Sequence, residues 1–144
     1  MMNKNQQTPH HLFCFVYLGF AHLSNTSISE KSIEEIERKI ASWMEVNPSN
    51  IVAFNRVIHE TYDWYHSIKG AEKFKMVIKA AKLINKIEGF NTDSKKIFLS
   101  DIRDIAVADG RFNHDEKNMH DVIAKELGIN IMTTDKVIQK RIGY

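Results

Sequence analysis

The chain has 144 residues, a formal net charge of +2, and 43% hydrophobic and 26% charged residues. This length and composition are typical of one soluble globular domain with a substantial core. The near balance of 20 basic and 18 acidic side chains argues against a nucleic-acid-binding protein, which usually carries a strongly basic surface. The single cysteine, Cys14, excludes an intramolecular disulfide and fits a reducing, cytoplasmic setting.

The first part of the chain combines a polar start with an apolar run. Residues 1–8 are polar, and we expect a flexible N-terminus that precedes one domain over residues 9–144. Thr8-Pro9 is suited to begin a helix, because proline is tolerated at the first helical position. The apolar run 12–23 is shorter than the ~20 residues of a membrane span. A buried helix is the favoured interpretation; a signal peptide is the alternative, although no clear cleavage site follows.

Apolar residues at helical spacing predict four more helices in the middle of the chain. The first has Ser29 as its N-cap, and Asn91 or Asp93 caps the fourth. The second and third end near Gly70 and Gly89. No stretch alternates with a period of two residues, so no strand is expected.

The expected fold is therefore all-α, a single compact bundle of about six to seven helices. We expect Ile97 inside this bundle, whereas Lys39 points outward and Trp64 lies off the apolar stripe of its helix, where it could contact a partner. The predicted core is apolar and comes from all parts of the chain: Phe15, Leu18, Ile36, Ile40, Phe54, Ile58, Val77, Ile78, Ile102, Ile105, Met119 and Ile123.

The stretch 105–128 contains the most informative local signals. It is expected to be the end of one helix, a turn at Asp109-Gly110, and a second helix from Asn113 to about residue 127. Asn113 is a good N-cap, and Glu116 stands three residues later, which completes the spacing of a capping box. Gly128 is placed to end this helix in a left-handed conformation. A short last helix would run from residue 133 or 134 to about 142.

Residues 107–129, VADGRFNHDEKNMHDVIAKELGI, resemble the signature of the TerB-like family of tellurite-resistance proteins. In that family an acidic ADG turn is followed by a helix that begins with an acidic residue and ends at LG. The resemblance implies a small helical bundle without an established reaction, linked to tellurite and stress resistance. It therefore implies a non-catalytic interaction module in an assembly, with a protein as its partner.

A weak internal repeat is also present. Residues 98–105 match residues 14–21 in their apolar positions at a spacing of 84 residues (98 − 14), and Asn113 falls opposite Ser29 at the same spacing. Two helix–turn–helix units joined by two linking helices are therefore plausible. Only the second unit carries carboxylates at its turn, because Asn25 stands where the second has Asp109.

The carboxylates of the second turn are candidate metal ligands. A divalent cation could be held weakly by Asp109, Asp115 and Glu116, with Asp104 and Asn113 as further oxygen donors. The spacing also resembles the second half of an EF-hand loop, which would make the chain a metal-dependent regulatory protein. The earlier ligand positions of such a loop are apolar here, and calcium requires 6–8 oxygens. The simpler alternative is that these carboxylates bind nothing and only stabilise the helix, because negative charges are favourable near the positive end of the helix dipole.

Zinc binding and catalysis have weaker support. His114, Glu116 and His120 are close in sequence, but they match no zinc signature, and exposed histidines on a solvated face are the simpler interpretation. Neither a nucleophile elbow nor a phosphate-binding glycine loop is present. Cys14 lies in an apolar run, where burial would make its thiol a poor nucleophile. We therefore expect no enzyme and no firm cofactor, with a metal-dependent hydrolase the least favoured alternative.

One further surface stands out in the pattern of charges. Lys75, Lys79, Lys82 and Lys86 recur at helical spacing and predict a basic stripe. Such a stripe could contact an anionic membrane surface or an acidic partner, or it could simply be a solvated face. Aromatic residues are not interleaved with these lysines, which argues against nucleic-acid binding.

Overall fold

The computed structural model describes residues 7–23, 28–108 and 114–129. These residues form six helices and no strand, which confirms the predicted all-α class. The helices are α1 (Pro9–His22), α2 (Glu30–Met44), α3 (Ile51–Ser67), α4 (Glu72–Asn85), α5 (Thr92–Val107) and α6 (His114–Glu126). The Asp109-Gly110 turn, the Asn113 cap and the expected helix after residue 133 lie outside the described residues.

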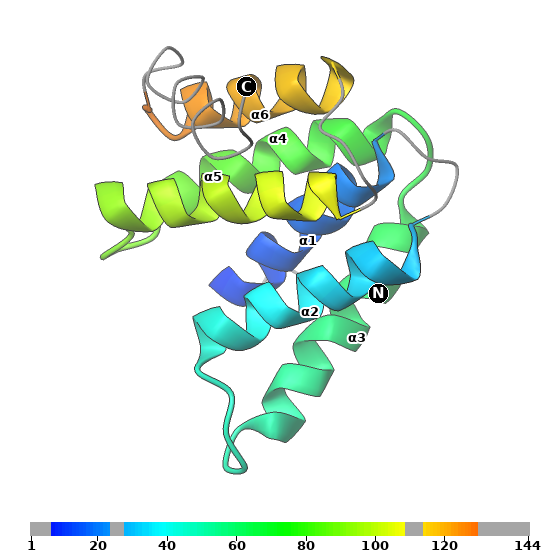
Figure 1. Cartoon of the computed structure of the whole chain (residues 1–144), viewed down its shortest axis with the longest axis vertical. Helices are drawn as coiled ribbons and strands as arrows, with labels where there is room; N and C mark the ends of the chain where they lie inside the picture. The colour runs from blue at the N-terminus through cyan, green and yellow to red at the C-terminus, as the bar shows by residue number, and fades with distance from the viewer. Residues whose placement is uncertain (1–6, 24–27, 109–113, 130–144) are drawn as a thin grey trace.

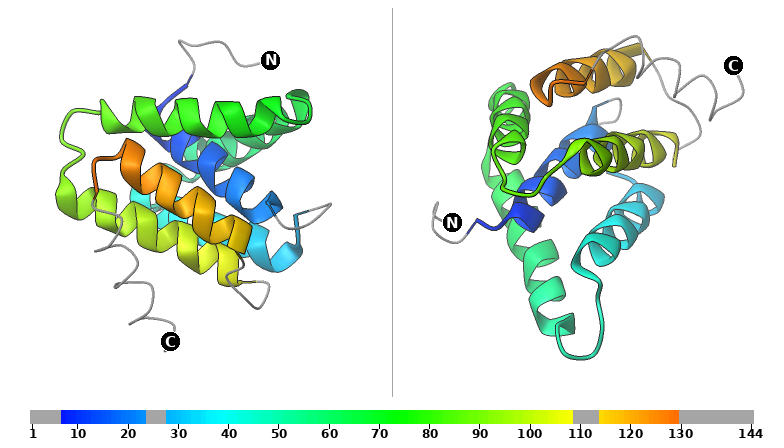
Figure 2. Two further views of the ribbon diagram at one scale, coloured as in Figure 1. Left: turned by 90° about the horizontal axis from the view of Figure 1, so that it is seen from above. Right: turned by 90° about the vertical axis from the view of Figure 1, so that its left-hand side faces the viewer.

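Helix α1 is the centre of the bundle. It contacts α2, α3, α4 and α5, and every residue from 11 to 21 is buried. Figure 1 and Figure 2 show α1 enclosed between α4 and α5 on one side and the α2–α3 hairpin on the other. Helix α6 lies across α4 and α5, at the end of the molecule opposite that hairpin. The apolar run that we expected to form a buried helix is therefore the core helix, because apolar residues cover all its faces.

The helix starts follow the cap residues in the sequence. The side chains of Thr8, Ser29 and Asn91 each accept a hydrogen bond from a backbone N–H in the first turn of their helices. In α1 the third helical residue is His11, whose Nδ1 accepts from the Thr8 N–H at 3.0 Å and completes a capping box. These caps confirm three predicted boundaries.

Helix α6 also ends as its sequence predicts. Gly128 has φ +74°, a left-handed conformation that glycine adopts at little cost. The N–H of Ile129 then donates to the carbonyl of Ala124 at 2.9 Å, which is the backbone bond of a Schellman motif.

The core differs from the prediction at particular residues. Eight of the twelve expected core residues are buried: Phe15, Leu18, Ile36, Ile40, Val77, Ile102, Ile105 and Ile123. The other four, Phe54, Ile58, Ile78 and Met119, are only partly buried because they lie at the edges of helix contacts. Two further residues have the opposite exposure to the one expected from the sequence. Ile97 is 53% exposed, whereas Trp64 is 5% exposed and packs on Phe15 with ring centroids 4.2 Å apart.

Helices α1 and α4 approach closely at Gly19. A Cβ atom at this position would overlap Cγ2 of Val77, so the absence of a side chain permits the crossing. Among the described residues, no helix combines the length and apolar character that crossing a membrane requires.

Candidate functional site

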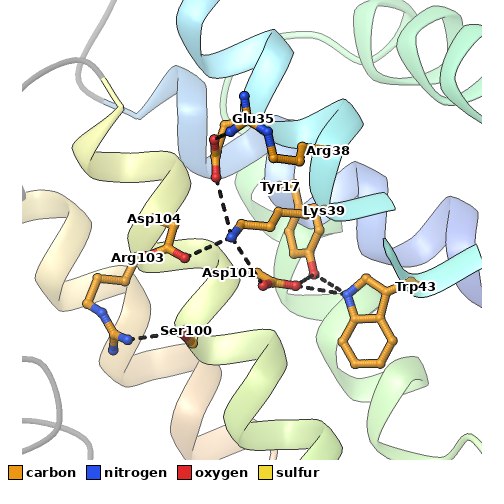
Figure 3. A network of polar contacts seen from close by, with 9 residues as sticks. All are labelled: Tyr17, Glu35, Arg38, Lys39, Trp43, Ser100, Asp101, Arg103 and Asp104. Carbon is orange, nitrogen blue, oxygen red and sulfur yellow. Dashed lines mark hydrogen bonds and ion pairs between the residues drawn. The ribbon is translucent and has the colours of Figure 1, made fainter. Parts of the chain in front are cut away.

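A polar cluster in the interior joins α1, α2 and α5 at Asp101 (Figure 3). The Tyr17 hydroxyl donates to Oδ2 of Asp101 at 2.7 Å, and the Trp43 indole N–H donates to the same oxygen at 2.9 Å. Lys39 Nζ lies 3.8 Å from the other carboxylate oxygen. Burial raises the pKa of Asp101, while these hydrogen bonds and the charge of Lys39 oppose the rise. The cluster therefore holds three helices together through one buried carboxylate.

Lys39 supplies the cation of this cluster. Its Nζ lies 2.8 Å from Oδ2 of Asp104 and 3.3 Å from Oε1 of Glu35, as Figure 3 shows. Burial opposes the charged form of Lys39, but the hydrogen bonds and charges of Asp104, Asp101 and Glu35 together outweigh it and raise the pKa of the ammonium. The prediction that Lys39 points outward is therefore wrong. Asp104, proposed from the sequence as a further metal ligand, is already paired with an ammonium group.

The acidic turn predicted as a metal site, with Asp109, Asp115 and Glu116, is only partly within the described residues. Asp109 and Asn113 lie outside them. Asp115 is exposed in the first turn of α6, whereas Glu116 is 3% exposed and turns into the bundle. The structure thus separates two carboxylates that the sequence places side by side. In the described part of the chain, no three histidine, cysteine, aspartate or glutamate side chains form a group suited to a metal ion.

The two histidines of the zinc hypothesis lie in different environments. His114 is exposed as expected, but His120 is fully buried, so the prediction that both lie on a solvated face is wrong. Its Nε2 is 3.2 Å from the carbonyl oxygen of Leu99, where a neutral imidazole can donate its N–H. Burial, with a smaller contribution from the charge of Arg103, lowers the pKa of His120 to about 4, and the hydrogen bond with the Leu99 carbonyl only partly opposes this shift. His120 is therefore a neutral core residue at pH 7.

The basic stripe is confirmed as an exposed feature of α4. All four lysines, Lys75, Lys79, Lys82 and Lys86, are exposed. Lys75 forms an ion pair with Glu72 at 3.2 Å within the same helix. Because an exposed ion pair of this kind is weak, it can be broken at little cost. The lysines of the stripe therefore remain available for contacts with an anionic surface.

A groove between α2 and α3 is the open feature that sequence reasoning missed. The apolar residues Phe54, Ile58 and Tyr62 recur every four residues along α3 and are only partly buried. The groove has a volume of about 310 Å³ and is lined by Glu37 from α2 and by Phe54, Asn55, Ile58, His59, Tyr62 and Asp63 from α3. The apolar stripe was visible in the sequence and was interpreted as core, because periodicity does not reveal how much of a helix its neighbour covers.

The charges at this groove have one sign. Glu37 and Asp63 are exposed at its edges, and none of the described residues that line it is a lysine or arginine. His59 Nε2 lies 3.5 Å from Oδ2 of Asp63, and both side chains are exposed. The lining of the groove therefore combines partly buried apolar side chains with exposed carboxylates.

The chain was compared with protein-family models, curated proteins and solved structures, and none of them matches it.

Proposed function

We propose that this chain is a non-catalytic interaction module whose α2–α3 groove binds a basic amphipathic helix of a protein partner. The observation that carries the proposal is the incompletely covered apolar stripe on α3. The resemblance of residues 107–129 to TerB-like proteins supports the same class of function and suggests a stress-response or tellurite-resistance assembly as the setting.

The shape of the stripe favours a helical ligand. Phe54, Ile58 and Tyr62 span about two turns of α3, and Ile51, which is 41% exposed, extends the apolar surface toward the start of the helix. An amphipathic helix that lies in a hydrophobic groove contributes anchors at positions i, i+3 or i+4, and i+7. The partner would bury its apolar face against this stripe.

The charges at the rim favour a basic ligand. Glu37 and Asp63 stand at the edges of the groove, where lysine or arginine side chains of a bound helix would lie. Complementary charges of this kind mainly improve selectivity and the rate of association, while the apolar contacts provide most of the affinity. The proposal therefore predicts binding that weakens moderately as salt rises.

A pair of synthetic helices tests this proposal. A 15-residue peptide with leucines on one face and lysines on the other is titrated calorimetrically into the full chain, and a peptide with glutamates in place of lysines is the control. We expect only the lysine peptide to bind, and Ile58→Glu to weaken its binding at least tenfold. Ile97→Glu is the matched control, because Ile97 is exposed on α5, away from the groove.

Two results would contradict the proposal: no binding of the lysine peptide to the wild-type chain, or equal binding to the wild-type and Ile58→Glu chains. The double variant Glu37→Lys/Asp63→Lys tests the charge argument separately. It should lose the lysine peptide and gain affinity for the glutamate peptide.

The acidic turn remains a second binding prediction for the same module. Asp115 is exposed where α6 begins, and with Asp109 it could hold a partner or a weakly bound divalent cation, whereas the buried Glu116 is no longer a candidate for this exposed site. Titration with calcium, magnesium, manganese and zinc, on the wild type and on Asp109→Ala/Asp115→Ala, tests the metal version. The absence of heat and of any change in melting temperature with all four ions would remove it, together with the regulatory and hydrolase alternatives.

A further inference from the structure

The charges of the chain are unevenly distributed, and the segment that contains α4 carries most of the positive charge. Residues 69–86 include six lysines and one glutamate, which give a net charge of +5 (6 − 1). The whole chain has a net charge of +2, so all the other residues together carry −3 (2 − 5). One helix therefore gives an almost neutral protein a strongly positive side.

The basic stripe forms a nearly straight line on the outside of the bundle. Its members are Lys75, Lys79, Lys82 and Lys86. Because they are spaced by four, three and four residues, they lie within about 60° around the helix and span about 16 Å along it. Helix α4 packs mainly against α1 and α6, and both views in Figure 2 show it at an edge of the bundle. A flat surface could therefore touch all four lysines at once.

Most of this positive charge is not neutralised within the described part of the chain. Of the four lysines, only Lys75 forms an ion pair there, with the exposed Glu72 of the same helix. The charges of the other three are left to attract an anionic surface outside the molecule.

Apolar side chains lie on both sides of the stripe. On one side, Leu83 is 38% exposed. On the side that faces α6, Phe74 and Ile78 lie one helical turn apart and are partly buried. Phe74 also lines a hollow of about 260 Å³, together with Met119 and Val122 of α6. Exposed lysines with apolar neighbours match the interface of a lipid bilayer, where charged headgroups meet acyl chains.

We propose that the basic stripe of α4 binds the surface of an anionic membrane, with Leu83 at the boundary between headgroups and acyl chains. The apolar face of α4 is packed in the core through Val77 and Ile84, so the helix stays part of the bundle when it binds. Attraction between the lysines and the anionic headgroups provides most of the binding. The contact is therefore reversible and weakens as salt rises.

A membrane fits this surface better than an acidic helix of another protein. The four lysines line neither the α2–α3 groove nor the hollow beside α6, so they stand on open surface, where a second helix would find little to pack against. A membrane needs no groove and presents negative charge along the whole stripe. Asp115, exposed at the start of α6, would repel such a surface, so the contact is centred on α4.

The inference does not depend on the function proposed for the α2–α3 groove. The stripe and the groove lie on different helices, so both could be occupied at the same time. A chain that uses both would bring a basic protein partner to an anionic membrane.

Vesicle sedimentation with the full chain tests the inference. The probes are vesicles of phosphatidylcholine alone and vesicles in which about one third of the lipid is phosphatidylserine. We expect the chain to sediment only with the anionic vesicles. Raising the salt from ~0.1 M to ~1 M should release it, because the screening length falls from about 10 Å to about 3 Å.

A pair of variants tests the role of the stripe. Each lysine near an anionic surface strengthens binding about fivefold, so Lys79→Gln/Lys82→Gln should weaken it about 25-fold. Lys31→Gln/Arg38→Gln is the matched control, because it removes the same charge from exposed positions on α2. The control should change binding less than about threefold, since charges far from the contact are screened.

A fluorescent label locates the contact. An environment-sensitive dye on Leu83→Cys should brighten and shift to shorter wavelength when anionic vesicles are added. The same dye on Ile97→Cys should not respond, since Ile97 is 53% exposed but lies on α5. The native Cys14 should not take up the dye in the folded chain, because it is buried and burial raises its pKa to about 12.

Several results would overturn the inference: no binding to anionic vesicles, equal binding to neutral vesicles, equal losses in the two double variants, or equal dye responses at the two labelled positions. Binding of the glutamate peptide that depends on the stripe, without binding to vesicles, would also overturn it and would assign the stripe to an acidic protein. Circular dichroism on each variant verifies that the fold is intact.

Discussion

Acidification from pH 7 to pH 4 should destabilise the protein through His120. This imidazole is fully buried within α6, with Phe20 at its edge and Arg103 nearby, and burial lowers its pKa to about 4. In the unfolded chain it would have an ordinary pKa of 6.5. A lowered pKa in the folded state means that the stabilising contribution is complete above pH 6.5 and is lost as the pH falls through about 4.

The size of the effect follows from these two values. The difference between 6.5 and about 4 corresponds to about 3 kcal/mol, at ~1.4 kcal/mol for each pH unit. This loss is large beside the ~5–15 kcal/mol stability of a typical domain. Most of it should occur between pH 6 and pH 4.

The assay is urea unfolding, followed by circular dichroism at several pH values, on the wild type and on His120→Gln. Glutamine is neutral throughout and can still donate to the Leu99 carbonyl. Asp101 acts in the opposite direction, because its raised pKa favours the folded state as the pH falls, but it is present in both chains. The difference between the two curves therefore isolates His120. Parallel curves from pH 7 to pH 4 would refute the reasoning.

Three further predictions concern the core. Gly19→Ala should destabilise the fold by ~1–3 kcal/mol in urea unfolding, because the added methyl group overlaps Val77; an unchanged midpoint would show that the helices can separate at little cost. Lys39→Met should cost ~1–3 kcal/mol in the same assay, whereas Lys79→Met on the exposed face of α4 should cost under ~0.5 kcal/mol; similar losses would contradict the role of the Asp101 cluster. Cys14 should react with a thiol reagent at pH 8 only as fast as the protein unfolds, since burial raises its pKa to about 12; rapid labelling of the native chain would contradict this.

Local signals in the sequence predicted the helices well. The caps at Ser29 and Asn91 and the left-handed Gly128 each depend on a few neighbouring residues, so they can be recognised without knowledge of the fold. Helix α1 was likewise identified from its continuous apolar run. These features fixed where the helices lie but not how they pack.

The interior was harder to predict because it depends on contacts between distant segments. Lys39 was expected outside since lysine is rarely buried, yet Asp101 and Asp104, which are more than 60 positions away, provide its partners. His120 and Glu116 occupy the inward face of α6, and the short sequence window around them could not show that α5 covers that face. Carboxylates that are adjacent in sequence thus proved poor indicators of a shared site.

The internal repeat suggested by the sequence remains a prediction, but one contact between the two units bears on it. Helix α2 begins at Glu30 and α6 at His114, a separation of 84 residues (114 − 30). Tyr17 and Asp101 are also 84 residues apart (101 − 17), and they share a hydrogen bond of 2.7 Å. If two related units pack around a local two-fold axis, equivalent residues meet where that axis passes. If the two units were identical at the Tyr17–Asp101 contact, either two carboxylates or two tyrosine hydroxyls would be buried against each other. A donor paired with an acceptor requires that the copies differ there, so asymmetry at this position would stabilise the interface between the units.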